Sequence, residues 1–283
     1  MGLFSLINKI RIGFIRSKEN SIPCESSIKK YGNFGEDKFV RDIQQVLPDC
    51  QIKRNVLVSS SDGNAEIDCL ILYRNKLFAV EVKRWKGRII ETDDGFIQKK
   101  TDRWTGEIHE KHLNSPFRQL NRAIYFLKHQ IPIKVWINAI VFFEDSEFET
   151  ALISSDNLWF SDIDEMARYI SCDGKSSKPS DVEKFFELCV SADLLYSRNW
   201  NKSLRCIIDK DSLKFQTSHG TVFRDIIDCI QIEHHWSYDE LNIKLIDGKS
   251  FTTTMENKKI MVNENGVYRE YALCKLDYIK LGR

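Results

Sequence analysis

The sequence has almost no excess of charge of either sign, and this excludes one simple class of nucleic-acid-binding protein. Its 283 residues include 42 Lys and Arg against 41 Asp and Glu, for a formal net charge of +1. A protein that coats nucleic acid with a uniformly basic surface needs a much larger positive excess. Any contact with phosphate groups must therefore come from local patches of basic residues.

The chain also lacks the residue spacings that indicate zinc fingers or thiol redox sites. Its 8 cysteines include no Cys-x-x-Cys pair, and its 6 histidines form no zinc-binding pattern with them. The sequence shows no signal peptide, so we expect free thiols in a reducing cytosol. A cytoplasmic location is the expectation that follows.

The apolar stretch near the N-terminus is too short to cross a membrane. Asn8, Lys9 and Arg11 interrupt residues 3–15, whereas a spanning helix needs about 20 apolar residues. We expect residues 1–27 to form an amphipathic segment followed by a linker. Such a segment suits a membrane surface, to which the protein would bind peripherally, or docking onto a protein partner.

The remaining chain divides into two parts by its pattern. With 42% apolar residues, it can bury a core in one large or two modest domains. Helical and strand patterns alternate in residues 28–171, which predicts an α/β domain. Residues 172–180 are polar and typical of a linker. Residues 181–283 begin with a helical pattern and continue as short strands separated by turns, which predicts a smaller antiparallel β-rich domain.

Residues 64–87 carry the pattern around which the first domain is organised. They predict two strands joined by a turn at Arg74-Asn75. Alternation along the first strand places Ile67 and Cys69 on one face and Asp68 on the other.

The register of this hairpin decides what its charged residues do. With a two-residue turn, Asp68 lies opposite Glu81, and Glu66 lies opposite Lys83. Like charges directly across a ladder, with Cβ atoms roughly 5 Å apart, repel each other. A divalent cation held by the carboxylate oxygens would make the pairing tolerable. If the loop were two residues longer, Asp68 would pair with Lys83 as an ordinary ion pair, so both possibilities stay open on the pattern.

Two predicted helices add polar residues near the hairpin. Glu36 lies in the first turn of a helix over residues 34–47, where it either caps the helix with Asn33 or contributes to a site. Ser115-Pro116 begins a later helix with a good cap. Gln119 lies on a polar flank of that helix, which suits either solvent or a site.

Basic and aromatic residues gather between residues 83 and 103 and again in the later helix. Basic side chains among exposed aromatic rings suit a strand of nucleic acid, because its phosphates attract cations and its bases stack. An ordinary surface with a few packed tryptophans would show the same pattern. The candidate nucleic-acid-binding residues are Arg84, Trp85, Lys86, Lys99, Lys100, Arg103, Arg118 and Arg122.

The β-rich region shows no catalytic constellation. His234 and His235 form the most conspicuous pair within it. Because neighbouring residues on a strand face opposite sides, we do not expect these two histidines to share a metal ion.

Four short elements occur in order along residues 32–143: Gly35-Glu36 on a helix, Glu66-Ile67-Asp68 on a strand, Glu81-Val82-Lys83 with Trp85 and Gly87 on the next strand, and Asn114-x-Pro116-x-x-Gln119 at the start of a later helix. Taken together, residues 32–143 resemble the nuclease-related domain known as NERD, a branch of the PD-(D/E)xK nuclease superfamily. Ser115, inserted between Asn114 and Pro116, departs from the family's Asn-Pro-x-x-Gln element and leaves the role of Asn114 open.

The resemblance implies a restriction-endonuclease-like mixed sheet flanked by helices, and a metal site upon it. In this superfamily the residues that match Asp68 and Glu81 hold Mg2+, for which Mn2+ is a possible substitute. The residue that matches Lys83 orients or activates the attacking water. The backbone carbonyl of Val82 would complete the set of protein ligands with a third oxygen.

The same resemblance implies supporting roles and a function. Glu36 would reach a second metal ion or a metal-bound water, and Gln119 would support the site by hydrogen bonding. The implied activity is metal-dependent hydrolysis of phosphodiester bonds, with DNA as the substrate and internal cleavage as the mode. The β-rich domain would then regulate or target the enzyme. The alternative is a catalytically idle module that binds nucleic acid or serves as an adaptor.

Overall fold

The chain forms two compact units, which divide between Ser191 and Ala192. The computed structural model describes residues 27–60, 63–102, 104–144, 146–148, 158–197, 202–217, 220–235, 238–255, 258–264 and 267–282. The amphipathic segment and linker expected over residues 1–27 lie outside the described residues except for Ser27, and so does Arg103. Within the described ranges, no helix has the length and apolar character needed to cross a membrane.

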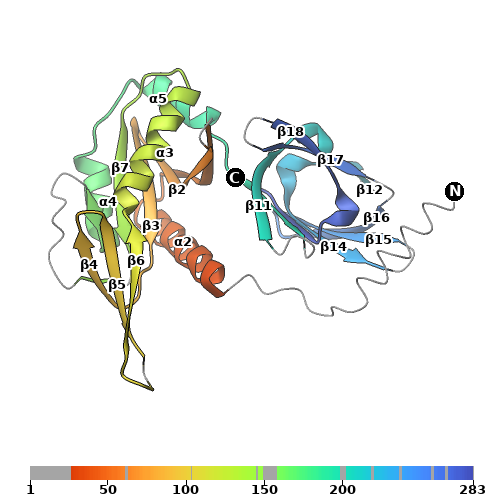
Figure 1. Cartoon of the computed structure of the whole chain (residues 1–283). Helices are drawn as coiled ribbons and strands as arrows, with labels where there is room; N and C mark the ends of the chain where they lie inside the picture. Colours follow the sequence, from red (N-terminus) through yellow and green to blue (C-terminus); the bar gives the residue numbers. More distant parts are fainter. Residues whose placement is uncertain are drawn as a thin grey trace. The chain divides into compact units, whose positions relative to one another are not determined.

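A five-stranded mixed sheet forms the centre of the N-terminal unit (Figure 1). The first three strands of its order, β1–β2–β3–β7–β9, pair antiparallel, whereas β3, β7 and β9 run parallel. A parallel neighbour requires a crossover connection, which the long segment between β3 and β7 supplies. The predicted mixed α/β fold is therefore confirmed. The strands are β1 (Gln51–Ser60), β2 (Gly63–Tyr73), β3 (Lys76–Lys83), β7 (Ile137–Phe143) and β9 (Trp159–Phe160).

Helices cover both faces of this sheet. Phe39 of α2 packs with Ile71 and Phe78 in one apolar cluster, which also includes residues of α4. Leu120 of α3 packs with Leu70 in a second cluster, on the other face, which also includes residues of α5. Strands buried on both faces explain the near-continuous apolar runs in the sequence. The helices are α2 (Ser27–Val46), α3 (Pro116–Gln130), α4 (Ile163–Cys172) and α5 (Pro179–Leu188).

A second, four-stranded sheet has the order β6–β5–β4–β8 and carries a hairpin that extends from the unit (Figure 1). We call this hairpin, formed by β5 and β6, the arm. At its tip the Asp102 carboxylate accepts hydrogen bonds from the backbone N–H groups of Trp104 (2.7 Å) and Thr105 (2.9 Å). The turn leaves Trp104 97% exposed. The strands are β4 (Arg88–Thr92), β5 (Gly95–Thr101), β6 (Ile108–Asn114) and β8 (Glu147–Phe148).

Helix α5 packs on the N-terminal unit, although its sequence pattern grouped it with the β-rich region. Phe185 and Phe186 are buried in the same apolar cluster as α3. Lys53 of β1 donates hydrogen bonds to the carbonyls at the end of the helix, those of Phe186 (2.6 Å), Glu187 (3.0 Å) and Cys189 (2.7 Å). A cation at a helix C-terminus satisfies carbonyls that have no partner within the helix.

The segment expected to be a linker, residues 172–180, also lies against this unit. Gly174 sits so close to Phe78 that a Cβ atom there would overlap the aromatic ring. The Asn138 side chain bonds to both the N–H and the carbonyl of Lys175, each at 2.9 Å. The polar composition of this segment therefore reflects local hydrogen bonding to the unit rather than a free connection.

The C-terminal unit is an antiparallel β structure, as predicted (Figure 1). Eight strands form one sheet in the order β16–β15–β14–β19–β10–β11–β17–β18, and β12 and β13 form a separate hairpin. Its core is a cluster of aliphatic side chains that includes Leu195, Ile230 and Ile260, all 0% exposed. The strands are β10 (Asp193–Ser197), β11 (Lys202–Ile208), β12 (Lys214–Thr217), β13 (Gly220–Phe223), β14 (Ile227–His234), β15 (Asp239–Leu245), β16 (Ser250–Met255), β17 (Lys259–Glu264), β18 (Val267–Ala272) and β19 (Tyr278–Lys280).

Candidate functional site

The β2–β3 hairpin has the register that a two-residue turn predicts. Arg74 adopts a left-handed conformation (φ 54°) at the turn, and the strands pair from there as far as Cys69 and Val80. The next position is occupied by Asp68 on β2 and Glu81 on β3. The wider loop, which would have paired Asp68 with a lysine, is therefore excluded.

Asp68 lies at the point where the regular pairing of β2 with β3 ends. Its Oδ2 accepts a hydrogen bond from the backbone N–H of Val82 at 2.8 Å. This bond fixes the carboxylate beside β3, on the strand that also carries Glu81. The expected role of the Val82 carbonyl as a metal ligand stays a prediction.

In strands β1 and β2, the regular alternation of side chains between the two faces of the sheet is interrupted at the level of Asp68. Asn55 of β1 is left-handed (φ 49°), and the pairing between the two strands is interrupted opposite it. Ile67 packs with Leu70 in the α3-side cluster, whereas Cys69 packs in the α2-side cluster. The prediction that Ile67 and Cys69 share a face is wrong, because the strands rotate between them.

Glu81 is wholly buried, with 0% of its surface exposed. Burial, followed by the charge of Asp68, raises the pKa of the Glu81 carboxyl from 4.5 to about 8. Lys83 Nζ donates a hydrogen bond to Glu81 Oε1 and opposes this rise. Within the described residues, Glu81 Oε2 is buried and has no hydrogen-bond partner. A buried carboxylate oxygen of this kind is costly to leave unpaired and is a suitable ligand for a hard divalent cation.

Two further carboxyl groups affect the pKa values of Glu81 and Lys83. Glu36 of α2 contributes to raising the pKa of Lys83, and Glu66 of β2 contributes to raising that of Glu81. We call Glu36, Glu66, Asp68 and Glu81 the acidic cluster. Burial works to lower the pKa of Lys83, but the charges of Glu81 and Asp68 and the hydrogen bond to Glu81 outweigh it, so the net shift is upward. Lys83 is therefore a charged ammonium at neutral pH.

The spacing of the acidic cluster limits how it can hold an ion. Across the ranges the structure describes, no three of its carboxyl groups come within 4.8 Å of one another. A single ion would thus take at most two of them directly. Asp68 and Glu81 are the pair that the hairpin register brings together, and the role expected of Glu36 stays a prediction.

Glu144 belongs to this region, although the sequence pattern did not single it out. It follows β7, is 4% exposed, and donates its N–H to the Lys83 carbonyl at 2.8 Å. Its carboxylate lies 2.8 Å from Lys38 Nζ and 3.6 Å from Arg84 Nε. Gly35 gives α2 the space for this approach, since a Cβ there would lie 3.1 Å from Glu144 Oε2. The only signal in the sequence is that Glu144 is the first acid after an apolar strand.

Helix α3 begins as predicted, but Gln119 is not joined to the acidic cluster. Ser115 is the cap, and its side chain accepts a hydrogen bond from the Arg118 N–H at 3.4 Å, with Pro116 in the first turn. The Gln119 side chain is exposed. In the part of the chain that is described, it makes no hydrogen bond to the cluster, and its supporting role stays a prediction.

Two of the residues expected to contact nucleic acid are engaged within the domain. The Trp85 ring lies 5.2 Å from that of Phe96 and 5.6 Å from that of Phe143, between ring centroids. Arg84 is held in the ion pair with Glu144. Both side chains are partly buried, so they are less available for stacking or phosphate binding than an exposed residue would be.

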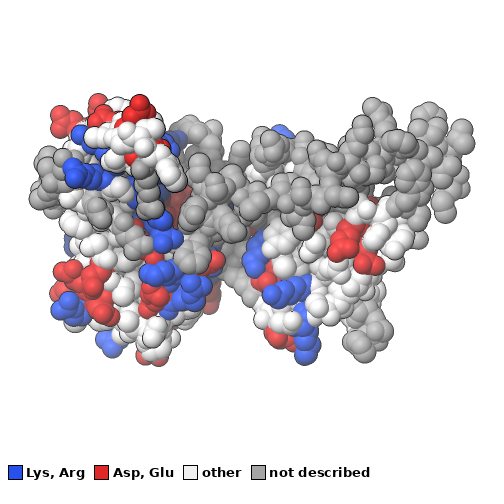
Figure 2. All heavy atoms as spheres, turned by 90° about the horizontal axis from the view of Figure 1, so that it is seen from below, with Lys and Arg blue, Asp and Glu red and all other residues white. Residues whose placement is uncertain are grey.

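The other basic candidates lie on the surface. Lys99 is partly exposed and forms an ion pair with Glu110 at 3.4 Å, and Arg118 donates to the Asp93 carbonyl at 2.9 Å. Basic and acidic side chains are interspersed on the face shown in Figure 2. The candidates in the exposed class are Lys86, Lys100, Arg118 and Arg122.

Comparison with known families and proteins gives one match. Residues 31–144 match the family model NERD, described as the nuclease-related domain. No curated protein and no solved structure matches the chain. The matched range contains the acidic cluster, Lys83, Gln119 and Glu144.

Proposed function

We propose that the protein is a metal-dependent nuclease that hydrolyses phosphodiester bonds of DNA, cutting within the strand, because residues 31–144 match the family model described as the nuclease-related domain. The observation that most supports this is the buried Glu81, whose Oε2 lacks a partner among the described residues and whose neighbour across the hairpin is a second carboxylate. A fold without a bound ion at this position would place two acids together at a cost in free energy.

We propose Mg2+, with Mn2+ as a substitute, as the ion at this site. Asp68 and Glu81 would hold it, and the Val82 carbonyl would add a third oxygen, because hard cations prefer carboxylate and carbonyl ligands. When bound, the ion would polarise the phosphodiester and lower the pKa of a water molecule. The high pKa of Glu81 is consistent with this role, since a cation would take the place of the proton that the buried carboxyl otherwise retains.

Lys83 is proposed to orient the attacking water and to stabilise charge on the phosphate. Its raised pKa keeps the side chain protonated at neutral pH, so it acts as a hydrogen-bond donor and not as a base. The hydrogen bond to Glu81 Oε1 holds its ammonium group at the site. With a side chain 20% exposed, it remains within reach of solvent and substrate. Glu36 and Gln119 would position groups around it from α2 and α3.

Substrate binding is proposed to use exposed cations and the arm. The side chains of four basic residues are exposed: Lys86, Lys100, Arg118 and Arg122. Each can neutralise a phosphate, and the resulting affinity for nucleic acid falls as the salt concentration rises. Trp104, at the tip of the arm, has an open aromatic face on which a base can stack. The C-terminal unit is proposed to regulate or target the nuclease.

One observation favours a second candidate, a catalytically idle module that binds nucleic acid. The Lys83–Glu81 hydrogen bond already supplies a positive charge to one oxygen of the buried carboxylate. If that contact persists when DNA is bound, the ammonium does not reach the substrate, and the domain serves as a binding or adaptor module.

A cleavage assay separates the two candidates. The full chain is incubated with supercoiled plasmid, linear duplex, single-stranded DNA and RNA, each with Mg2+, Mn2+, Ca2+ or a chelator. Asp68→Asn and Lys83→Ala are compared with Asp164→Asn and Lys134→Ala, which remove exposed charges elsewhere on the unit. We expect the unaltered protein to cleave with Mg2+ or Mn2+. The cleavage rate should fall at least ~100-fold in the two site variants and should be unchanged in the two controls.

Each result has a clear meaning. Cleavage that survives chelator, or that persists in Asp68→Asn, contradicts the proposed site. Binding of DNA without cleavage under any metal condition favours the idle module. Circular dichroism of each variant shows whether a lost activity reflects lost folding.

A further inference from the structure

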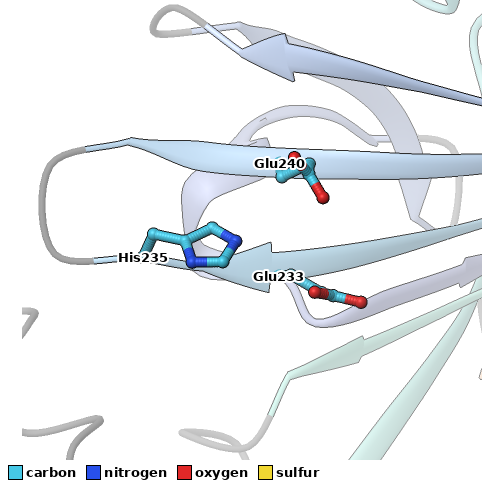
Figure 3. A group of neighbouring side chains, drawn as sticks. All are labelled: Glu233, His235 and Glu240. Atoms are coloured by element: carbon cyan, nitrogen blue, oxygen red, sulfur yellow. The ribbon is translucent and has the colours of Figure 1, made fainter.

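The C-terminal unit carries a second group of metal-ligating side chains, far along the sequence from the acidic cluster. Glu233 lies on β14 with His235 just beyond the end of that strand, and Glu240 lies on β15. The register pairs Glu233 with Glu240 directly, and His235 follows two residues after Glu233 on the same face. Figure 3 shows the three side chains at the end of this hairpin. One ligand atom from each lies within 4.8 Å of the other two.

Glu233 and Glu240 form a like-charge pair, and no positively charged side chain among the described residues forms an ion pair that would offset their repulsion. Carboxylates directly opposite each other on an antiparallel ladder repel. Within the described part of the chain, neither Glu233 nor Glu240 forms an ion pair with a lysine or arginine, and the side chain that donates a hydrogen bond to Glu233 is the neutral amide of Asn242. A bound cation would convert this repulsion into attraction.

Side chains outside the group hold two of its members in place. Asn242 Nδ2 donates to Glu233 Oε1 at 2.9 Å, and its own Oδ1 accepts a hydrogen bond from Thr252 Oγ1 at 2.8 Å. These two hydrogen bonds link β14, β15 and β16, and among the described residues no hydrogen bond is made to the other oxygen of Glu233. The His235 ring stacks on Tyr238, with 4.6 Å between ring centroids and 23° between planes. Outer hydrogen bonds and packing of this kind orient metal ligands before the ion arrives.

His234 shows what a structural histidine looks like in the same hairpin. Its Nδ1 is bonded to Asp239 Oδ1 at 2.6 Å and its Nε2 to the Leu276 carbonyl at 2.9 Å, and its side chain is only 7% exposed. His235 points to the other face, is exposed, and lies beside two carboxylates. The prediction that the two histidines do not share an ion agrees with this arrangement, but one of them has acidic partners from the neighbouring strand.

We propose that Glu233, His235 and Glu240 bind a divalent transition-metal ion of the Zn2+ type, which fastens the end of the β14–β15 hairpin. One imidazole and two carboxylates form a donor set that zinc accepts, with the remaining position left for water. Mg2+ and Ca2+ prefer oxygen ligands alone, so the imidazole selects against the ion proposed for the nuclease site. The two sites therefore differ in the ion they take. This inference does not depend on the proposed nuclease activity.

The test is a metal titration of the full chain after removal of bound metal with a chelator. Co2+ is added as a spectroscopic probe, its visible absorption is followed, and Zn2+ is then used to displace it, all with excess Mg2+ present. His235→Ala and Glu240→Gln are compared with His112→Ala, which removes an exposed histidine of the arm. Asp68→Asn serves as the control for the acidic cluster.

We expect one Co2+ site with an imidazole ligand, which Zn2+ displaces and excess Mg2+ does not; any Co2+ held by the acidic cluster is the part that Asp68→Asn loses. Affinity should fall at least ten-fold in His235→Ala and Glu240→Gln, and stay within two-fold in His112→Ala and Asp68→Asn. X-ray absorption at the zinc edge of the unaltered protein should show one imidazole among oxygen ligands. Absence of a Co2+ band, affinity unchanged by His235→Ala, or a zinc edge without imidazole would each overturn the proposal.

Discussion

Replacing Glu81 by Gln should change how the stability of the N-terminal unit varies with pH. Burial and the charge of Asp68 raise the folded-state pKa of Glu81 to about 8, whereas its ordinary value is 4.5. Between these values the folded state retains a proton that the unfolded state has lost. The free energy of unfolding therefore falls as pH rises through this interval. The stabilisation is fully present below pH 4.5 and is lost by the time the pH passes about 8.

The size of the effect follows from the two pKa values. A group that is protonated only in the folded state changes the free energy of unfolding by about 1.4 kcal/mol for each pH unit. Across the interval this amounts to roughly 5 kcal/mol, a large part of the stability of a typical domain. Gln keeps the shape of the side chain and cannot ionise. Without metal, the Glu81→Gln variant should lack this slope and should be the more stable protein above pH 8.

The assay is chemical denaturation of the full chain in the presence of chelator, from pH 5 to pH 9, followed by tryptophan fluorescence. Asp164→Asn, a change at an exposed acid of α4, is the matched control. The difference between the profiles of the unaltered protein and Glu81→Gln isolates this one group from the remaining acids. Parallel profiles for the two proteins would refute the reasoning, because they would mean that Glu81 titrates normally.

Four other outcomes are expected. Binding of Mg2+ at pH 7 should release close to one proton, because Glu81 must ionise; calorimetry in buffers of different ionisation enthalpy measures this, and zero release would contradict it. Gly174→Ala should destabilise the N-terminal unit by about 1–3 kcal/mol in urea denaturation, since the new Cβ overlaps Phe78. Lys53→Met should lower the free energy of unfolding of the N-terminal unit by about 1.5–3 kcal/mol, because three carbonyls lose a charged donor. An unchanged midpoint of urea denaturation would show that water replaces the lysine as their donor. Trp104→Ala should leave stability unchanged, since the ring is 97% exposed, yet weaken DNA binding about ten-fold in a fluorescence anisotropy titration.

The hairpin at the centre of the candidate site was readable from the sequence. Strand alternation predicted the two strands and the turn at Arg74-Asn75 but left two registers open, and the structure has the register of the two-residue turn. The juxtaposition of Asp68 and Glu81 follows from it by counting. Local rules could not choose between the two turn lengths, but once the turn is short the two strands have no freedom to slide.

Features that depend on contacts between distant parts of the chain could not be predicted from the sequence. The change of face between Ile67 and Cys69 depends on the left-handed Asn55 of a neighbouring strand, and alternation within one strand carries no trace of it. Helix α5 has an ordinary amphipathic pattern, which does not say against which unit its apolar face packs. Glu144 became part of the site only through the ion pairs that its position after β7 allows.

The basic and aromatic candidates show the same limit. Composition alone did not distinguish Trp85, which packs against Phe96 and Phe143, from Trp104, which is almost wholly exposed. The distinction arises because Trp85 follows a central strand of the sheet, whereas Trp104 lies in a turn of the arm. Exposure of an aromatic residue is a property of its place in the fold.

Anomalous diffraction from crystals grown with Mn2+ would test the central claim most directly. Data collected on either side of the manganese absorption edge locate the ion without assumptions about activity. We predict a peak bound by the carboxylates of Asp68 and Glu81, which is lost in crystals of Asp68→Asn. Crystals of the unaltered protein with no peak between these two side chains, at Mn2+ concentrations that saturate binding in solution, would contradict the assignment of this hairpin as a metal site.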